Sequence, residues 1–197
     1  MPASNSLATL QRAVQECRGC PLFADTTQAV FGDGTGSASI MLVGEQPGDQ
    51  EDKQGHPFVG PAGGVLWSCL EAAGIGRDDV YATNAVKHFK HEQRGKRRIH
   101  KKPDAGEIEA CHPWIEAELR TVHANVVVAL GATAARSLFG RTLSIGANRN
   151  VERTLRGVPV VVTYHPSAVL RANEAAAEFR AALTEDLGRA ARLANLR

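Results

Sequence analysis

The sequence predicts a three-layer α/β/α fold with a central four-stranded parallel sheet. Four short apolar runs of strand length recur along the chain, at residues 40–43, 80–86, 126–130 and 158–163. Segments with helical periodicity separate them, and this alternation is typical of a parallel sheet covered on both faces. The length suits one domain with a sizeable core, so we expect a single domain over residues 1–197.

The first expected element is a helix over residues 6–16, where apolar residues fall at helical spacing. Cys17-Arg-Gly-Cys20-Pro follows it. Two cysteines in such a turn can both face a metal centre. A thioredoxin-like redox pair would need a strand before it, so the preceding helix and Pro21 argue against that alternative.

The first strand, residues 40–43, ends at Gly44 and leads into a stiff turn that carries Glu45, Gln46 and Asp49. Ligands of open parallel sheets bind at the carboxyl ends of the strands. The carboxylates of Glu45 and Asp49 are therefore candidate catalytic groups at this edge of the sheet. Alternatively, this is an ordinary connecting loop with solvated acids.

The next segment is a loop rich in Gly and Pro, followed by a helix over residues 65–73. The loop contains Phe58, whose ring either faces a ligand or fills the edge of the core. Cys69 lies on the apolar face of the helix, where a core role is expected. The second strand then carries Asn84 near its end.

A basic strip follows the second strand. Residues 87–102 hold eight Lys and Arg residues against the single acid Glu92, while the rest of the chain has more acids than bases. A local cationic segment on an acidic body favours a polyanion as partner, and a solvated loop is the alternative.

The second half of the chain continues the alternation. Asp104 and Glu107 form a capping box for a long helix in which Cys111 lies one turn from the start. The later elements are the third strand, a short helix over residues 132–138, a weak polar hairpin over residues 142–156, the fourth strand and a closing helix over residues 175–193.

Tyr164-His165-Pro166-Ser167 follows the fourth strand directly. Glu45, Gln46, Asp49, Asn84 and His165 thus come from the ends of three strands. Because parallel strands end at the same edge of a sheet, we expect these side chains to gather there. This convergence is harder to explain by chance than any single motif.

The chain begins without a signal-peptide pattern and has no stretch long and apolar enough for a membrane span. We therefore expect a cytoplasmic protein, in a bacterial cytosol or nucleoid. In that compartment the four cysteines are metal ligands or core residues rather than disulfide partners.

Four motifs together resemble the uracil-DNA glycosylase superfamily, and most closely its iron–sulfur family four. They are Gly44-Glu-Gln-Pro-Gly48, Pro57-Phe-Val-Gly60, Thr83-Asn84-Ala-Val-Lys87 and His165-Pro166-Ser167. Gln46, where family four has Ala, and the inserted loop Gly95-Lys-Arg-Arg-Ile-His100 resemble UdgX, the branch that becomes covalently fixed to DNA. The likeness runs from Cys17 to about Arg171.

The resemblance implies excision of uracil from DNA. Phe58 would stack on the flipped base, Asn84 would read its polar edge, and His165 would stabilise the departing uracil. His100 would then attack C1′ and form a lasting adduct, with Glu45 orienting it. Gly44 and Gln46 belong to the expected substrate site, and Asp49 to the expected catalytic group.

The resemblance also implies a [4Fe–4S] cluster on Cys17, Cys20 and Cys111. The fourth family-four cysteine is replaced here by His88, the expected fourth ligand, with Cys69 as its competitor. The same ligand set would suit zinc. The expected role of the metal is structural.

The expected partner is uracil-containing DNA, single strands included, bound by a monomer. The expected DNA contacts are Lys96, Arg97, Arg98, Lys101, Ser167 and Arg171. Two alternatives to the covalent enzyme remain: an ordinary turnover uracil-DNA glycosylase, and a non-catalytic iron–sulfur module that binds nucleic acid.

Overall fold

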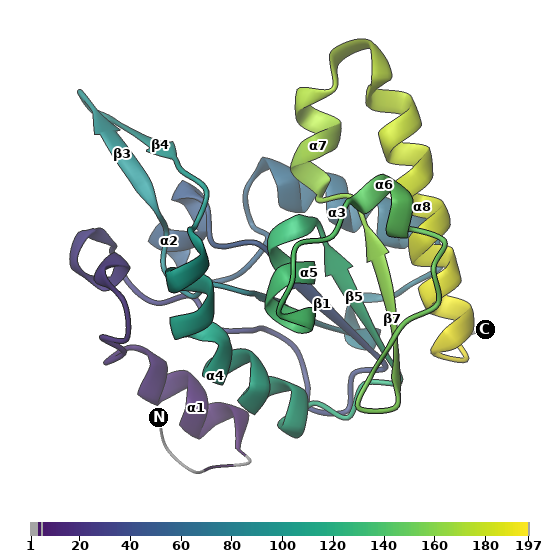
Figure 1. Ribbon diagram of the computed structural model, residues 1–197, viewed down its shortest axis with the longest axis horizontal. Coiled ribbons are helices and arrows are strands. Elements are labelled where there is room, and N and C mark those ends of the chain that lie inside the picture. Colours follow the sequence, from purple (N-terminus) through teal and green to yellow (C-terminus); the bar gives the residue numbers. More distant parts are fainter. Residues whose placement is uncertain (1–3, 5, 197) are drawn as a thin grey trace.

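A computed structural model describes residue 4 and residues 6–196, and it has the expected α/β architecture around a twisted sheet (Figure 1). The strand order is β2–β1–β5–β7–β6. The bounds are β1 Ile40–Gly44, β2 Val80–Asn84, β5 Val126–Leu130, β6 Thr154–Leu155 and β7 Val158–Thr163. Four strands are parallel, as predicted, and the short β6 adds an antiparallel fifth at the edge.

Successive residues of the central strands point into two different cores, which explains their unbroken apolar runs. Ile40 and Leu42 belong to a core formed with α3 (Pro61–Ala72) and α8 (Ala176–Leu193). Met41 and Val43 belong to a second core on the opposite face. The helices of that face are α4 (Ala105–Thr121) and α5 (Ala132–Phe139).

A third cluster attaches the N-terminal segment to the body. The helix α1 (Leu7–Val14) packs its buried residues Leu10 and Val14 beside Trp114 of α4. The remaining short elements are η1 Pro21–Asp25, α2 Asp49–Gln54, η2 Arg77–Asp79, α6 Ile145–Asn148, α7 Pro166–Arg171 and η3 Asn173–Ala175. None of the helices within the described residues is long and apolar enough to cross a membrane.

Two segments differ from the sequence prediction. The basic strip, expected as a loop, contains an antiparallel hairpin of β3 (His91–Arg94) and β4 (Arg97–His100), which turns at Gly95 with φ +57°. Figure 1 shows this hairpin projecting from the body, on the side toward which the arrowheads of β5 and β7 point. Residues 142–156, expected as a hairpin, form α6 and then β6, whose pairing partner is β7.

Candidate active site

Asn84 and the ring of Phe58 meet beside Gly44, where β1 and β2 end. Gly44 and Asn84 are directly paired in the parallel register. A Cβ atom on Gly44 would clash with Asn84 Oδ1 and lie 2.7 Å from Phe58 Cζ. Only glycine therefore leaves room for an amide and an aromatic ring to meet at this point.

Phe58 is held in an unusual backbone conformation. Its φ is +56°, in the left-handed region that a bulky residue rarely adopts. Trp67 Nε1 donates a hydrogen bond to the Phe58 carbonyl oxygen at 3.1 Å. The ring is almost fully buried, and its centroid lies 6.4 Å from that of His165.

His165 caps α7 after the end of β7, and its environment fixes the tautomer. The Ser167 backbone N–H donates to Nδ1 at 3.2 Å, so the ring proton is carried by Nε2. Burial lowers the pKa of His165 to about 4, although nearby Glu45 opposes that shift. At neutral pH the ring is therefore an uncharged hydrogen-bond donor.

Glu45 lies between the sheet and the hairpin. Its Oε2 accepts a hydrogen bond from Thr133 Oγ1 at 2.6 Å, and its Oε1 lies 3.5 Å from His100 Nε2. The His100 side chain is 48% exposed. Its pKa is lowered, chiefly by burial and also by Arg171, while Glu45 acts in the opposite direction. The neutral imidazole carries a free lone pair, which is the form a nucleophile needs.

Gln46 fastens the root of the hairpin to the end of β1. Its Nε2 donates to the carbonyl oxygens of Lys90 and Lys101, at 3.1 and 3.0 Å. Its Oε1 accepts from the Lys90 backbone N–H at 3.1 Å. The amide thus bonds to backbone on both sides of the hairpin, one residue after Glu45.

Arg98 provides a second attachment. Its guanidinium pairs with Asp49 at 2.7 Å and with the buried Asp52 at 2.5 Å, and its side chain is only 16% exposed. Lys53 and Arg98 lower the pKa of Asp49. Asp49, expected in the catalytic group, and Arg98, expected on phosphate, are therefore both engaged in attaching the hairpin.

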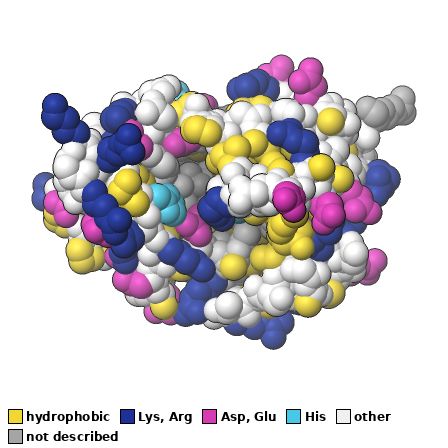
Figure 2. Space-filling model, turned by 90° about the horizontal axis from the view of Figure 1, so that it is seen from above, with side chains coloured by type: hydrophobic (Ala, Val, Ile, Leu, Met, Phe, Trp, Pro, Cys, Tyr) yellow, Lys and Arg dark blue, Asp and Glu magenta, His cyan; other side chains and the backbone are white. Residues whose placement is uncertain are grey.

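The other expected DNA-binding residues lie around the site. Lys96 and Arg97 are exposed on the hairpin, and Lys101 is exposed but pairs with Glu92 at 2.6 Å. Arg171 donates to Ser167 Oγ at 2.9 Å. Figure 2 shows Lys and Arg side chains and a His beside a hollow on the face seen from above.

Three of the expected metal ligands lie near each other where α1 meets α4. The pKa of Cys111 is raised to about 12 by burial, and the nearby Cys17 and Cys20 raise it further. Trp114 Nε1 donates to Cys17 Sγ at 3.2 Å, and the Lys87 backbone N–H donates to Cys111 Sγ at 3.3 Å. Such N–H donors stabilise thiolate ligands.

The sequence predicts His88 as the fourth ligand, with Cys69 as its competitor. These two residues lie in different parts of the fold. His88 follows Lys87 and is buried, which lowers its pKa and keeps the ring neutral, as a metal ligand requires. Cys69 is buried in the core under α3, apart from the cluster that contains Cys111. Since the Lys87 backbone N–H contacts Cys111 Sγ, the chain brings the neighbouring His88, rather than Cys69, to the three cysteines, and this donor set fits a metal group.

A site for a single metal ion such as zinc requires several ligand side chains to converge on one point. In the described part of the chain, no three His, Cys, Asp or Glu side chains converge on one point. The ligands of an iron–sulfur cubane bind separate irons and need not converge.

Sequence reasoning missed three supporting residues, because their role depends on distant partners. Lys87 is fully buried; its Nζ pairs with Glu118 at 2.5 Å and donates to the Asn84 carbonyl oxygen at 2.9 Å. Glu51 accepts from the backbone N–H groups of Gly48 and Gly60, which joins the turn after β1 to the Phe58 loop. Thr133 holds Glu45, as described above.

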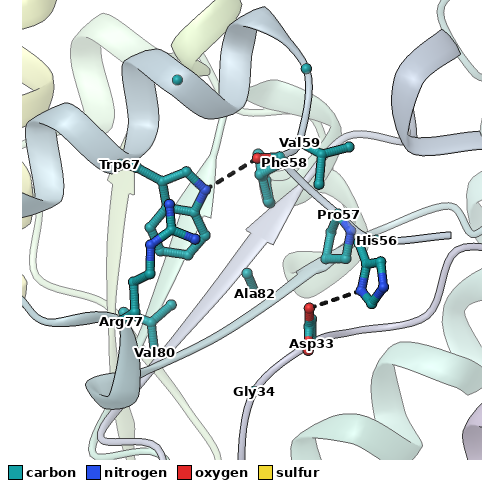
Figure 3. A pocket seen from close by; sticks show the side chains of 12 residues that line it. Asp33, Gly34, His56, Pro57, Phe58, Val59, Trp67, Arg77, Val80 and Ala82 are labelled. Atoms are coloured by element: carbon teal, nitrogen blue, oxygen red, sulfur yellow. Dashed lines mark hydrogen bonds and ion pairs between the residues drawn. The ribbon is translucent and has the colours of Figure 1, made fainter. Parts of the chain in front are cut away.

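A cavity of about 540 Å³ is lined by residues of the Phe58 loop, Phe58 among them. Figure 3 shows Trp67 and Arg77 on one side of it, and the Asp33–His56 pair on the other. Glu45, Asn84, His100 and His165 do not line it. Phe58 does line it, so the cavity adjoins the candidate active site at the Phe58 loop.

Comparison with known proteins shows which family and which relatives this sequence resembles. The sequence model of the Uracil DNA glycosylase superfamily matches residues 31–188. The chain is 39% identical to the Type-4 uracil-DNA glycosylase of Thermotoga maritima over 90% of this chain and 88% of that protein. It is 38% identical to the Type-4 uracil-DNA glycosylase of Archaeoglobus fulgidus over 84% and 83% of the two chains. A Type-5 uracil-DNA glycosylase of Pyrobaculum aerophilum is 32% identical over 66% and 62%.

Proposed function

Because this chain belongs to the uracil DNA glycosylase superfamily, we propose that it excises uracil from DNA and then becomes covalently linked to the sugar through His100. The names of its type-4 relatives support the excision step. The position of the His100 ring, 3.5 Å from Glu45 and beside the strand ends, supports the linkage.

Excision begins with a nucleotide flipped out of the base stack. Phe58 stacks on the uracil ring, and Asn84 reads its O4 and N3–H edge, whose donor pattern cytosine reverses. His165 donates from Nε2 to O2 as the C1′–N1 bond breaks and its electron pair leaves with uracil. The neutral donor stabilises that developing charge, and C1′ becomes a cation resembling an oxocarbenium ion.

The linkage step consumes this cation. A ring nitrogen of His100 forms a bond to C1′ with its lone pair, and the proton on the other ring nitrogen passes to the Glu45 carboxylate. The lowered pKa of His100 keeps the lone pair available at neutral pH. Imidazole is a poor leaving group there, so the adduct persists.

The second candidate is an ordinary turnover glycosylase, in which water takes the place of His100. It is favoured by the type-4 names of the relatives, and it needs only the residues at the strand ends. A non-catalytic module is a third candidate, and it predicts no uracil release.

Denaturing electrophoresis with a uracil-containing single-stranded oligonucleotide, together with assay of free uracil, separates these candidates. We expect a heat-stable shifted band that is lost in His100→Ala. His91→Ala is the matched control, since His91 pairs with His100 across the hairpin and is expected to keep the band. Released uracil without any shifted band would establish the turnover enzyme instead.

We also propose a [4Fe–4S] cluster held by Cys17, Cys20, Cys111 and His88. When bound, it would tie the N-terminal segment to α4 and to the chain leading into the hairpin, since His88 precedes β3. A brown protein with iron and sulfide in equal amounts supports this proposal, and stoichiometric zinc would exclude it.

The exposed cations Lys96 and Arg97 are proposed to contact phosphates, in a monomer that accepts single strands. Replacing either by Ala is expected to weaken DNA binding for all sequences and to reduce its salt dependence. Affinity measured at several salt concentrations tests this, and sedimentation tests the oligomeric state.

A further inference from the structure

Within the described part of the chain, one side-chain hydrogen bond holds the Glu45 carboxylate, and its donor is a residue that sequence reasoning did not identify. Thr133 Oγ1 donates to Oε2 at 2.6 Å, while Oε1 lies 3.5 Å from His100 Nε2. Thr133 is 2% exposed. Its hydroxyl is therefore a fixed donor in a buried place, and the other oxygen faces the imidazole.

The position of Thr133 is set by the middle of the sheet. β5 pairs with both β1 and β7, and α5 begins immediately after it at Ala132. Gly131 adopts φ +88°, and a Cβ atom there would lie 3.0 Å from the Cβ of His165. The turn at Gly131 thus lies against His165 and leads into Thr133, which holds Glu45.

The side chain of Thr133 is suited to holding a carboxylate still. A β-branched residue in a helix has few χ1 rotamers, and its hydroxyl can satisfy one carboxylate oxygen at a time. Without this donor, Glu45 could rotate toward the half-exposed side of the site and order a water molecule. In that case water oxygen would bond to C1′ and give its proton to Glu45, leaving a free abasic site.

We propose that Thr133 is a positioning residue that directs the C1′ cation to His100 rather than to water. This rests on the proposed covalent function. It predicts that loss of the hydroxyl changes the product ratio more than it changes uracil release, because the hydroxyl donates to Glu45 and not to Asn84 or His165.

The experiment compares Thr133→Val, which keeps the shape and removes the donor, with Thr133→Ser, which keeps the donor. Ser137→Ala is the matched control: Ser137 is buried one turn further along α5, and its hydroxyl has no hydrogen-bond partner in the described structure. Single-turnover reactions are analysed for free uracil, crosslinked protein and free abasic DNA.

We expect Thr133→Val to lower the ratio of crosslink to free abasic DNA about tenfold, with uracil release reduced less than threefold. Thr133→Ser restores most of the ratio, and Ser137→Ala leaves it unchanged. A wild-type ratio in Thr133→Val, or a Ser variant as defective as Val, overturns this proposal while wild-type crosslinking stands. Wild-type protein that releases uracil without crosslinking overturns the covalent function and this proposal with it.

Discussion

Replacement of Gln46 by Ala tests whether the hairpin must be held for His100 to react. Gln46 makes three hydrogen bonds to the hairpin root, two to carbonyl oxygens and one from a backbone N–H. Each contributes about 1 kcal/mol net, so the variant is expected to reduce the free energy of hairpin opening by about 3 kcal/mol.

That energy sets the size of the measurable effect. A change of about 3 kcal/mol corresponds to roughly 100-fold faster hydrogen exchange of the hairpin amides, read from peptides covering residues 91–100. The crosslinked fraction is expected to fall, because His100 is then less often beside Glu45. Uracil release is expected to continue, since Asn84 and His165 belong to other elements.

Gln50→Ala provides the control, because Gln50 is an exposed glutamine on the adjacent α2. It is expected to leave both exchange and crosslinking unchanged. Faster exchange with full crosslinking in Gln46→Ala would show that hairpin placement does not limit the reaction. Unchanged exchange would show that the three hydrogen bonds contribute little.

Three further predictions concern stability and the cluster. Lys87→Met leaves Glu118 charged and buried, and is expected to cost about 3–5 kcal/mol in chemical denaturation; a loss below about 1 kcal/mol would contradict this. His165 is held at a pKa of about 4 against 6.5 when unfolded, so the unfolded chain binds more protons between these values, and the fold loses stability as pH falls from 6.5 to 4. Denaturation at several pH values should show that the wild-type protein loses up to about 3 kcal/mol more unfolding free energy over this range than His165→Asn does. Equal dependence of the unfolding free energy on pH in the two proteins would refute the prediction. Cys111→Ser is expected to abolish the visible absorption of the cluster while Cys69→Ser keeps it, and the reverse result would assign the ligand to Cys69.

The parallel sheet could be predicted because its signal is local. A strand buried on both faces needs apolar residues in succession, and the runs in β1, β5 and the middle of β7 meet that requirement. The grouping of Glu45 and Asn84 followed from the rule that parallel strands end at one edge. Such inferences need no knowledge of which strands are neighbours.

The hairpin could not be predicted in this way. The strands His91–Arg94 and Arg97–His100 are polar apart from the exposed Ile99, and they lack the alternation that marks a half-buried strand. They are held by contacts with distant residues, namely Gln46 at the root and Asp49 and Asp52 at Arg98. Lys87 was missed for a related reason: lysine is normally exposed, and only the fold brings Glu118 to it.

The two parts of the site differ in how they are built, and this bears on the chemistry. Asn84 ends β2, His165 lies two residues after β7, and the Phe58 carbonyl is held by Trp67, so on the proposed mechanism base recognition and departure depend on the central sheet. His100 lies on a projecting hairpin, and the Gln46 amide and the Arg98 guanidinium are among the groups that attach it to the body. On the proposed mechanism we therefore expect excision and linkage to be separable. Changes in the attachments should alter which nucleophile reaches C1′, and changes at the strand ends should alter whether the bond breaks at all.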